Sequence, residues 1–164
     1  MGRMHGVSED QLVGAISLPD GTVLRGRGRA EPLPSGPPPH YGLYLGHAPD
    51  IGRIRLPWRG GSAWRPDWPA EWIDWPDFRI PRDSDSAAGL IRHAYLLARS
   101  GQRVEVACVG GTGRTGTVIA CMAILAGHPP SDAVNWTRAH YRPRAVETPG
   151  QRRWITWFAS WQEG

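Results

Sequence analysis

Apolar residues recur at helical spacing in the second half of the chain. Between residues 84 and 100 they fall three and four positions apart, and Gly101 stands where such a helix would end. The apolar run over residues 117–126 ends at Gly127 in the same way, because glycine is the preferred residue just past a helix. The sequence therefore predicts four helices, over residues 84–100, 117–126, about 131–142 and 149 to about 161.

Strand-like patterns lie before and between these helices. Residues 103–107 alternate like a short buried strand, and residues 41–45 form a second candidate strand. Residues 16–24 resemble a hairpin around the turn Asp20-Gly21. This alternation of strands and helices predicts an α/β fold, in which a central and mostly parallel sheet carries helices on both faces.

The remaining segments read as irregular. Residues 25–40 are rich in Gly, Pro and Arg, and residues 1–10 are expected to be flexible. Residues 58–76 hold five of the nine tryptophans amid prolines, and such tryptophans usually pack in the core or under loops. At 164 residues the chain fits one domain, 1–164, with a core of useful size.

Composition excludes several classes of protein. No stretch of about eighteen apolar residues is present, so no transmembrane helix is expected, and the N-terminus lacks the apolar core of a signal peptide. Two cysteines argue against a disulfide framework and for a reducing, cytoplasmic environment. Cys121 lies within an apolar helical run, where packing in the core is its expected role.

The charge of the chain fits a modestly positive approach to an anion site. The formal net charge is +4, and all 19 basic residues are arginines, as the codon bias of a GC-rich genome would produce. They are scattered along the chain, so nucleic-acid binding is not expected. We also expect no metal, no cofactor and no contact with a membrane, and the pattern indicates no particular oligomeric state.

One string of residues carries most of the chemistry, Cys108-Val109-Gly110-Gly111-Thr112-Gly113-Arg114-Thr115-Gly116. It lies between a predicted strand and a predicted helix, which is the layout of an anion cradle. Converging backbone N–H groups and the positive end of the helix would stabilise the thiolate of Cys108, the nucleophilic form. Arg114 offers a planar fork for two oxygens of an oxyanion, and Thr115 can donate its hydroxyl to the sulfur. The predicted bound species is a phosphoryl group.

This string resembles the signature loop of the cysteine-dependent protein tyrosine phosphatase superfamily. A second motif, residues 74–81, resembles the Trp-Pro-Asp loop of that family, and its Asp77 lies 31 residues before Cys108, as in compact, dual-specificity-like bacterial members. A third stretch, residues 144–151, resembles the family's glutamine-bearing loop. Together the three motifs cover roughly residues 72–158.

The resemblance implies a phosphomonoester hydrolase that works in two steps on phosphotyrosine or another phosphoprotein. Cys108 would attack phosphorus while Asp77 protonates the leaving oxygen, and water would then hydrolyse the phosphocysteine with Asp77 as base. Arg114 and Thr115 complete the catalytic set that the resemblance implies. The expected phosphate-binding residues are those of the loop itself, Val109, Gly110, Gly111, Thr112, Gly113 and Arg114. Asp74 and Asp67 lie in similar settings and remain alternatives to Asp77.

Three departures from the family pattern qualify this prediction. Ala107 stands where the family usually has a histidine that orders the loop and tunes the thiolate. Glu147 stands where classical members carry a water-orienting glutamine, and Gln151 could serve instead or could cap the helix that begins at Pro149. The upstream loop that stacks the phosphotyrosine ring in classical members has no counterpart here.

Two other classes of protein fit parts of the pattern. A phosphate-binding module with weak catalysis, like a pseudophosphatase, would explain Ala107 and Glu147. A sulfur-transferring enzyme could carry a persulfide on Cys108, but it would need no acid at Asp77. For the phosphatase, the cradle suits phosphotyrosine, phosphoserine or phosphothreonine, phosphoinositide and RNA 5′-phosphate alike. Arg79, Arg82, Arg142 and Arg144 could attract an anionic substrate, although a solvated surface position is the ordinary role of such residues.

Overall fold

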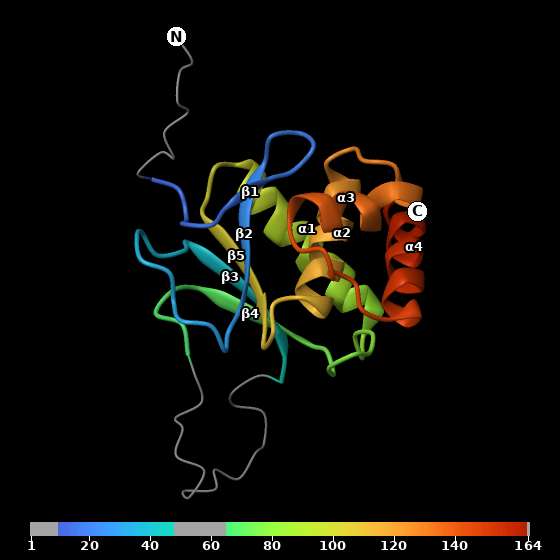
Figure 1. The fold of residues 1–164 in the computed structure, drawn as a ribbon, viewed down its shortest axis with the longest axis horizontal. Coiled ribbons are helices and arrows are strands. Elements are labelled where there is room, and N and C mark those ends of the chain that lie inside the picture. Colours follow the sequence, from blue (N-terminus) through green and yellow to red (C-terminus); the bar gives the residue numbers. More distant parts are fainter. Residues whose placement is uncertain (1–9, 48–64, 164) are drawn as a thin grey trace, which may run out of the picture.

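A five-stranded sheet forms one layer of the protein. The computed structural model describes residues 10–47 and 65–163 (Figure 1). The strands are β1 (Ile16–Ser17), β2 (Val23–Gly28), β3 (Tyr41–Gly46), β4 (Ala70–Asp74) and β5 (Val104–Cys108). Their order is β1-β2-β5-β3-β4, and every pair is parallel except β1 with β2. The predicted α/β class and the mostly parallel sheet are confirmed, as is the predicted hairpin.

Helices account for most of the second half of the chain. They are α1 (Ser84–Arg99), α2 (Gly113–Leu125), α3 (Ala133–His140) and α4 (Pro149–Glu163), with the short 3₁₀ helix η2 (Pro130–Asp132) before α3. Gly101 and Gly127 end α1 and α2 in the left-handed conformation, each at φ +97°, as the sequence predicts. Helix α2 begins at Gly113, earlier than the apolar run suggests, because the glycine-rich loop itself turns into the first helical turn.

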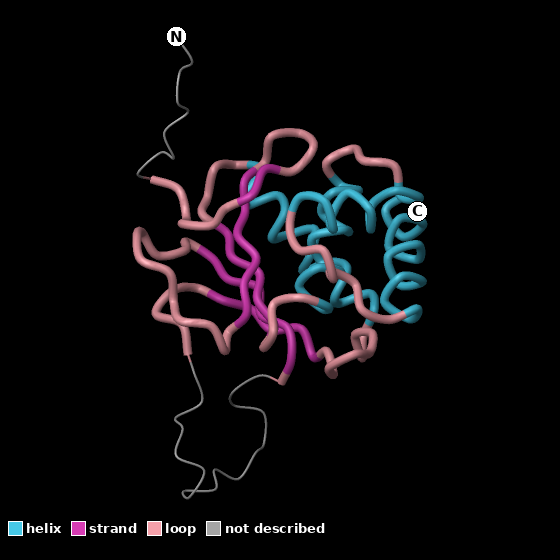
Figure 2. Tube along the Cα trace, in the orientation of Figure 1, coloured by secondary structure: helices cyan, strands magenta, loops and turns pink. Residues whose placement is uncertain are grey.

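In the described residues the four helices lie together on one face of the sheet, whereas the sequence analysis placed helices on both faces. Helix α1 contacts α2 as well as strands β2, β3, β4 and β5, and α4 packs on α2. Figures 1 and 2 show the four helices together on the same side and loops on the other. The core fills the space between the sheet and the helices, and its largest buried side chains include Leu43, Trp75, Ile119, Met122 and Phe158.

Two segments of the first half differ from the sequence prediction. Strand β2 continues to Gly28, into the stretch 25–40 that its Gly, Pro and Arg content marks as irregular. Strand β4 lies inside the tryptophan-rich stretch, where no strand is predicted. The predicted flexible residues before Asp10, and Trp58 and Trp64 of that stretch, lie outside the described residues. Among the described helices, none is long and apolar enough to span a membrane.

A buried polar cluster explains why β2 does not read as a strand. On the face away from the helices, the fully buried carboxylate of Glu105 accepts hydrogen bonds from Arg25 Nη2 at 2.6 Å, Arg27 Nε at 2.5 Å and the Tyr44 hydroxyl at 2.8 Å. Burial alone would raise the pKa of Glu105. The bonds from Arg27 and Tyr44 and the charges of both arginines outweigh burial and hold that pKa below its ordinary value.

Removal of the Glu105 carboxylate is expected to destabilise the fold by about 3–5 kcal/mol, because two buried guanidinium groups would lose their counter-ion. Chemical denaturation of Glu105→Ala measures this loss. Glu71→Ala, an exposed carboxylate of β4, is the control and should cost less than about 1 kcal/mol. Equal stability of the two variants would contradict a structural role for the cluster.

The same ion cluster predicts a pH dependence of stability. Because the pKa of Glu105 is lower in the folded than in the unfolded state, the unfolded chain takes up a proton more readily. Glu105 therefore makes its full contribution to the free energy of unfolding when the pH is above the ordinary pKa of a carboxylate, about 4. This contribution is lost as the pH falls below that value.

Candidate active site

The loop of residues 108–113, here called the cysteine loop, joins β5 to α2. Cys108 ends β5, at the carboxyl edge of the parallel strands, and its side chain is nearly fully buried. Its Sγ accepts hydrogen bonds from the Gly111 N–H at 3.1 Å and from the Thr115 hydroxyl at 3.1 Å. Thr115 Oγ1 also accepts from the Cys108 N–H at 2.9 Å, so the threonine fixes both ends of the cysteine. Two donors therefore point at a sulfur that lies beside the N-terminus of α2, as a thiolate requires.

The glycines of the cysteine loop are needed for close packing. Gly111 has φ +76°, and a Cβ there would overlap the backbone of Arg27 and Gly28 in β2. Gly113 lies against the carboxylate of Glu147, which a Cβ would likewise displace. At Gly111 and Gly113 there is therefore no room for a side chain, whereas a Cβ on Gly110 would meet nothing within 4 Å. The first N–H groups of α2 have no partner within the helix and are available to an anion.

Arg114 connects the cysteine loop to residues 75–81, here called the aspartate loop. Its guanidinium is buried, with 5% of the residue exposed, and donates from Nη1 to the Trp75 carbonyl at 2.9 Å. Its Nη2 lies 3.5 Å from Asp77 Oδ1. Arg114 Nε is also buried, yet no described residue forms a hydrogen bond with it. A buried donor without a partner is costly, and an oxyanion in the loop would supply the missing acceptor.

Among the three candidate carboxylates, the structure brings Asp77 to the cysteine loop. Asp77 and Cys108 line the same pocket of about 350 Å³. Asp74 is turned away, because its carboxylate pairs with Arg82 Nε at 3.2 Å and lies 3.7 Å from His47. Asp67 precedes β4 and does not line the pocket.

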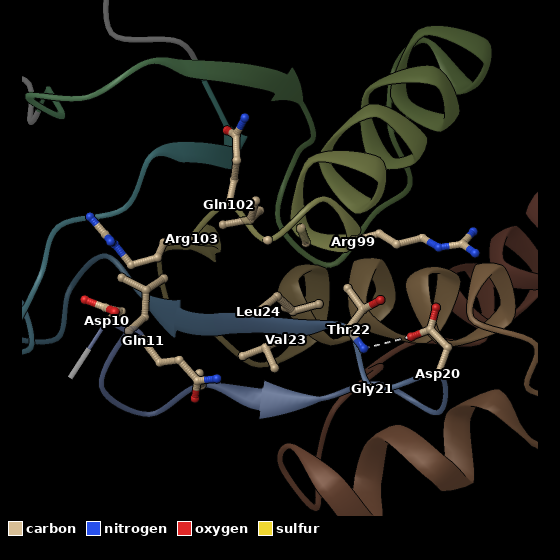
Figure 3. Close-up of a pocket in the computed structure, with 15 residues that line it drawn as sticks. Asp10, Gln11, Asp20, Gly21, Thr22, Val23, Leu24, Arg99, Gln102 and Arg103 are labelled. Atoms are coloured by element: carbon tan, nitrogen blue, oxygen red, sulfur yellow. Dashed lines mark hydrogen bonds between the residues drawn. The ribbon is translucent and has the colours of Figure 1, made fainter. Parts of the chain in front are cut away.

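The pocket around Cys108 is polar and contains charges of both signs. Besides Asp77 and Cys108, it is lined by Phe78, Gly110, Thr112, Gly113, Arg144 and Glu147. Another pocket, of about 380 Å³, lies at the opposite end of β5, around Gln102 and Arg103 (Figure 3). That pocket contains Asp20, whose carboxylate is occupied by the Thr22 N–H at 2.9 Å and by the Tyr95 hydroxyl. Only the first of these two pockets has a thiol, so the chemistry belongs there.

The two candidates for positioning water have different places in the structure. Glu147 lines the pocket, with its carboxylate against Gly113. Gln151 is fully buried, and its Oε1 accepts from the Glu147 N–H at 2.9 Å while its Nε2 donates to the Arg79 carbonyl at 3.4 Å. The Gln151 N–H bonds Thr148 Oγ1 at 3.2 Å, so the predicted helix cap is present. Gln151 thus braces the aspartate loop against the loop before α4, and only Glu147 faces the pocket.

Two residues beside the pocket carboxylates adopt left-handed backbone conformations that are costly for non-glycine residues. Phe78 follows Asp77 and has φ +59°, and Val146 precedes Glu147 and has φ +66°. Arg138 holds the second of these turns, because its guanidinium donates to the carbonyls of Ala145 and Val146 at 2.9 Å each. Each strained residue is thus the sequence neighbour of a carboxylate that lines the pocket.

Sequence analysis missed the residues that hold the cysteine loop from outside. The Tyr141 hydroxyl donates to the Gly111 carbonyl. Arg142 donates to the Gly110 carbonyl at 3.0 Å and to Glu31 at 2.8 Å, so it is a brace and not the free anion-attracting residue considered above. No local pattern marks these roles, since the partners lie about 30 and 111 residues away in the chain.

The other predicted residues are placed as follows. Among the arginines considered as attractors, Arg144 lines the pocket, whereas Arg82 pairs with Asp74. Cys121 is fully buried in α2, where burial raises its pKa well above the ordinary value. It therefore remains a neutral core thiol.

Three solved structures with a similar fold are those of phosphatases or a phosphatase-like protein. The structure of Tk-PTP in its active form has a TM-score of 0.57 and 23% identity, over 74% of this chain and 79% of that one. The kinase associated phosphatase has a TM-score of 0.56 and 15% identity, over 76% and 71%. The human tyrosine phosphatase-like serine/threonine/tyrosine-interacting protein has a TM-score of 0.54 and 10% identity, over 76% and 78%. At these identities the likeness concerns the fold.

Sequence relatives cover a shorter part of the chain. The uncharacterized proteins MJECL20 and MJ0215 of Methanocaldococcus jannaschii are each 34% identical over 89 residues, which is 53% of this chain. The match spans 57% of the first relative and 53% of the second, so the chain corresponds to about half of their length.

The family model for protein-tyrosine phosphatases matches residues 61–155. This range contains the cysteine loop, the aspartate loop and the segment before α4 with Arg144 and Glu147, which are the parts that build the pocket. It covers more than half of the chain, and the fold agrees with it. The chain therefore belongs to the protein-tyrosine phosphatase family.

Proposed function

We propose that the protein hydrolyses phosphomonoesters through a phosphocysteine formed on Cys108. The observation that carries this proposal is the environment of the Cys108 sulfur. It accepts hydrogen bonds from Gly111 N–H and the Thr115 hydroxyl, lies at the N-terminus of α2, and shares a pocket with Asp77. A sulfur stabilised as thiolate and a carboxyl group at the same pocket are the two partners that phosphoryl transfer to cysteine requires.

The first step transfers the phosphoryl group to sulfur. The Cys108 thiolate attacks phosphorus, an S–P bond forms and the bond from phosphorus to the ester oxygen breaks. Asp77 gives its proton to that oxygen, which leaves as an alcohol or phenol. Arg114 holds two equatorial oxygens of the phosphoryl group, and its unpartnered Nε finds an acceptor there.

The second step releases phosphate. Water attacks phosphorus, the Asp77 carboxylate takes one proton from it, and the S–P bond breaks to return the thiolate. The Thr115 hydroxyl, 3.1 Å from the sulfur, stabilises the negative charge that returns to it. Glu147, against Gly113 in the pocket, is placed to orient this water, whereas Gln151 is occupied with the two loops. The sum of both steps consumes one phosphomonoester and one water.

The proposed substrate is a phosphorylated protein, with phosphotyrosine or phosphoserine and phosphothreonine as the side chains concerned. Family membership supports phosphorylated substrates as a class. A preference for both kinds of side chain, as in dual-specificity members, is favoured by the absence of a ring-stacking loop in the sequence before Cys108. The exposed Phe78 and Arg144 at the pocket would contact the residues that flank the phosphate.

Hydrolysis of a small aryl phosphate in the presence of a metal chelator tests this proposal. We expect turnover that the chelator leaves unchanged and that vanadate, an oxyanion of similar shape, inhibits. A phosphopeptide panel with tyrosine, serine and threonine in one sequence context then ranks the substrates.

A phosphate-binding module with weak catalysis is the alternative, and the Glu147 carboxylate in the pocket is the observation that favours it, because it would repel phosphate. Stoichiometric binding of a phosphopeptide without release of phosphate would decide for that alternative and against a hydrolase. Glu147→Gln separates the two further, since relief of repulsion should lower KM of a hydrolase several-fold.

A further inference from the structure

Strand β2 and the residue after it form an arginine ladder on one face of the sheet. In the sequence Arg25-Gly26-Arg27-Gly28-Arg29, the alternation places the glycines toward the helices and the cysteine loop. A Cβ on Gly28, for example, would meet the backbone of Gly110 at 2.8 Å. The arginines therefore share the opposite face with Glu105.

The ladder is only partly neutralised. Arg25 and Arg27 both pair with Glu105, at 2.6 Å and 2.5 Å. Arg29 has no carboxylate within ion-pair distance in the described part of the chain. Two of the three guanidinium groups thus pair with the one buried carboxylate of Glu105, and the third, Arg29, lies at the end of the ladder that is nearest the cysteine loop.

Arg29 is fixed beside Cys108 and Arg114. Its N–H donates to the Cys108 carbonyl at 2.8 Å, and its guanidinium lies over the Trp72 ring, 4.9 Å from the ring centre. Arg29 Nη2 donates to the Leu45 carbonyl at 3.3 Å, while its Nε is buried without a partner among the described residues.

The guanidinium groups of Arg29 and Arg114 approach the same point of the structure. A Cβ on Gly46 would lie 3.0 Å from Arg29 Nη2 and 3.5 Å from Arg114 Nη1. Burial, and after it the charge of Arg114, lowers the pKa of Arg29 from its ordinary value. An arginine side chain nevertheless stays charged in proteins. Two like charges held this close repel each other until an anion binds between or beside them.

We propose that Arg29 is a positioning residue that adds a second fixed positive charge behind the cysteine loop and so strengthens the binding of a doubly charged phosphoryl group there. The proposal rests on the proposed function, because it concerns the same site. It also explains how the site can function with Ala107 in place of the expected histidine. That residue pairs in register with Arg27 and Tyr44, and it lies on the face of the ladder where other family members are expected to have a histidine. The guanidinium of Arg29 supplies a positive charge there, and the backbone N–H of the same residue holds the Cys108 carbonyl.

The test measures charge at the site without using turnover. Alkylation of Cys108 is followed with iodoacetate, which is an anion, and iodoacetamide, which is neutral, at one pH. The ratio of the two rates reports the local potential, because both reagents react with the same thiolate. Protection of Cys108 by tungstate, a doubly charged oxyanion, gives the affinity for a phosphate-like ligand. Cys121 is fully buried in the core and does not line this pocket, so it does not interfere.

Arg29→Met keeps a straight side chain on Trp72 and removes the charge, and Arg29→Lys keeps the charge. We expect Arg29→Met to lower the iodoacetate to iodoacetamide ratio and to weaken tungstate protection by about tenfold, the size of one unit-charge interaction in a partly buried site. Arg29→Lys should retain most of both values. Arg92→Met, an exposed arginine of α1, is the control for loss of net charge and should leave both values within about twofold.

The possible results separate this proposal from the proposed function. A wild-type Cys108 that tungstate does not protect would overturn the phosphate site itself. Protection of the wild type together with an Arg29→Met variant of equal rate ratio and equal tungstate affinity would overturn the role of Arg29 alone. Arg29→Gln, which can still donate to the Leu45 carbonyl, takes the place of Arg29→Met where the latter does not fold.

Discussion

Replacement of Cys108 by serine is expected to abolish hydrolysis of aryl phosphates, with a loss of about 10⁴-fold or more, the scale on which removal of a catalytic nucleophile acts. The Gly111 N–H and the Thr115 hydroxyl can stabilise a thiolate, but they are too weak to ionise a serine hydroxyl, and no general base lies at the sulfur in the described structure. The variant therefore keeps the cradle and loses the nucleophile. Steady-state rates with a chromogenic aryl phosphate measure the effect.

Cys121→Ser is the matched control for this change. Cys121 is fully buried in α2, and burial raises the pKa of its thiol well above the ordinary value, so it has no nucleophilic role. We expect normal activity per folded molecule and a modest loss of stability, about 1–3 kcal/mol, because a hydroxyl takes the place of a thiol in an apolar core. Activity that survives in Cys108→Ser, or that disappears in Cys121→Ser at full folding, would contradict the assignment of the nucleophile.

The Cys108→Ser variant should still bind oxyanions. Its backbone N–H groups and Arg114 are unchanged, and the removal of a negative thiolate relieves repulsion of a phosphate. Stabilisation of the variant by tungstate in thermal unfolding, at least equal to that of wild type, is the expected result. Loss of binding together with loss of activity would point to a collapsed loop and not to a missing nucleophile.

The parts of the site that are local in sequence could be predicted, and the parts assembled over distance could not. The anion-binding loop from Cys108 to Gly116 can be predicted from consecutive residues, because a strand, glycines and a helix N-terminus follow each other directly. A motif of its own points to Asp77, but only the structure separates it from Asp74, which pairs with Arg82, and from Asp67, which does not line the pocket. The sequence likewise does not decide between Glu147 and Gln151, because only the structure shows that Glu147 lines the pocket while Gln151 bonds to the loop backbone.

Arginine and glycine in alternation misled the fold prediction. Residues 25–28 are predicted to be irregular because charged and small residues are rare in buried strands. In the structure, Arg25 and Arg27 can be buried because both donate hydrogen bonds to the carboxylate of Glu105 in the neighbouring strand. The glycines of β2 allow close packing, since a Cβ on Gly26 would meet Ile119 of α2 at 2.8 Å. In the described residues, the same cluster lies on the face of the sheet that the four helices do not cover. Such complementarity between distant residues leaves no periodic signal.

Replacement of Asp77 by asparagine is expected to lower kcat by about 10²–10³-fold for substrates with poorly acidic leaving alcohols. Asparagine has nearly the shape of aspartate, but it cannot give a proton to the leaving oxygen. Asp77 is 60% exposed at its side chain and lies 3.5 Å from Arg114, so the change disturbs little of the packing. Binding of tungstate or phosphate should therefore stay within a few-fold of wild type.

A series of aryl phosphates with increasingly acidic phenols identifies the role of Asp77. A phenol that leaves without help needs no proton, so the defect in kcat/KM should shrink as the acidity of the phenol rises, and the dependence on leaving-group acidity should be steeper in Asp77→Asn than in wild type. The second step still needs a base. With the most acidic phenol, the variant should then release a rapid burst of product and accumulate phosphocysteine, which mass spectrometry of acid-quenched protein detects on Cys108.

Asp74→Asn is the matched control, because Asp74 stands three residues earlier and pairs with Arg82 instead of facing the pocket. It should keep nearly full activity and show the leaving-group dependence of wild type. If Asp74→Asn were slow and Asp77→Asn were normal, the acid would have to come from Asp74 after a rearrangement of the aspartate loop. If both variants were normal, neither Asp74 nor Asp77 would act as the acid, and proton delivery would fall to water or to Glu147, the other carboxylate that lines the pocket.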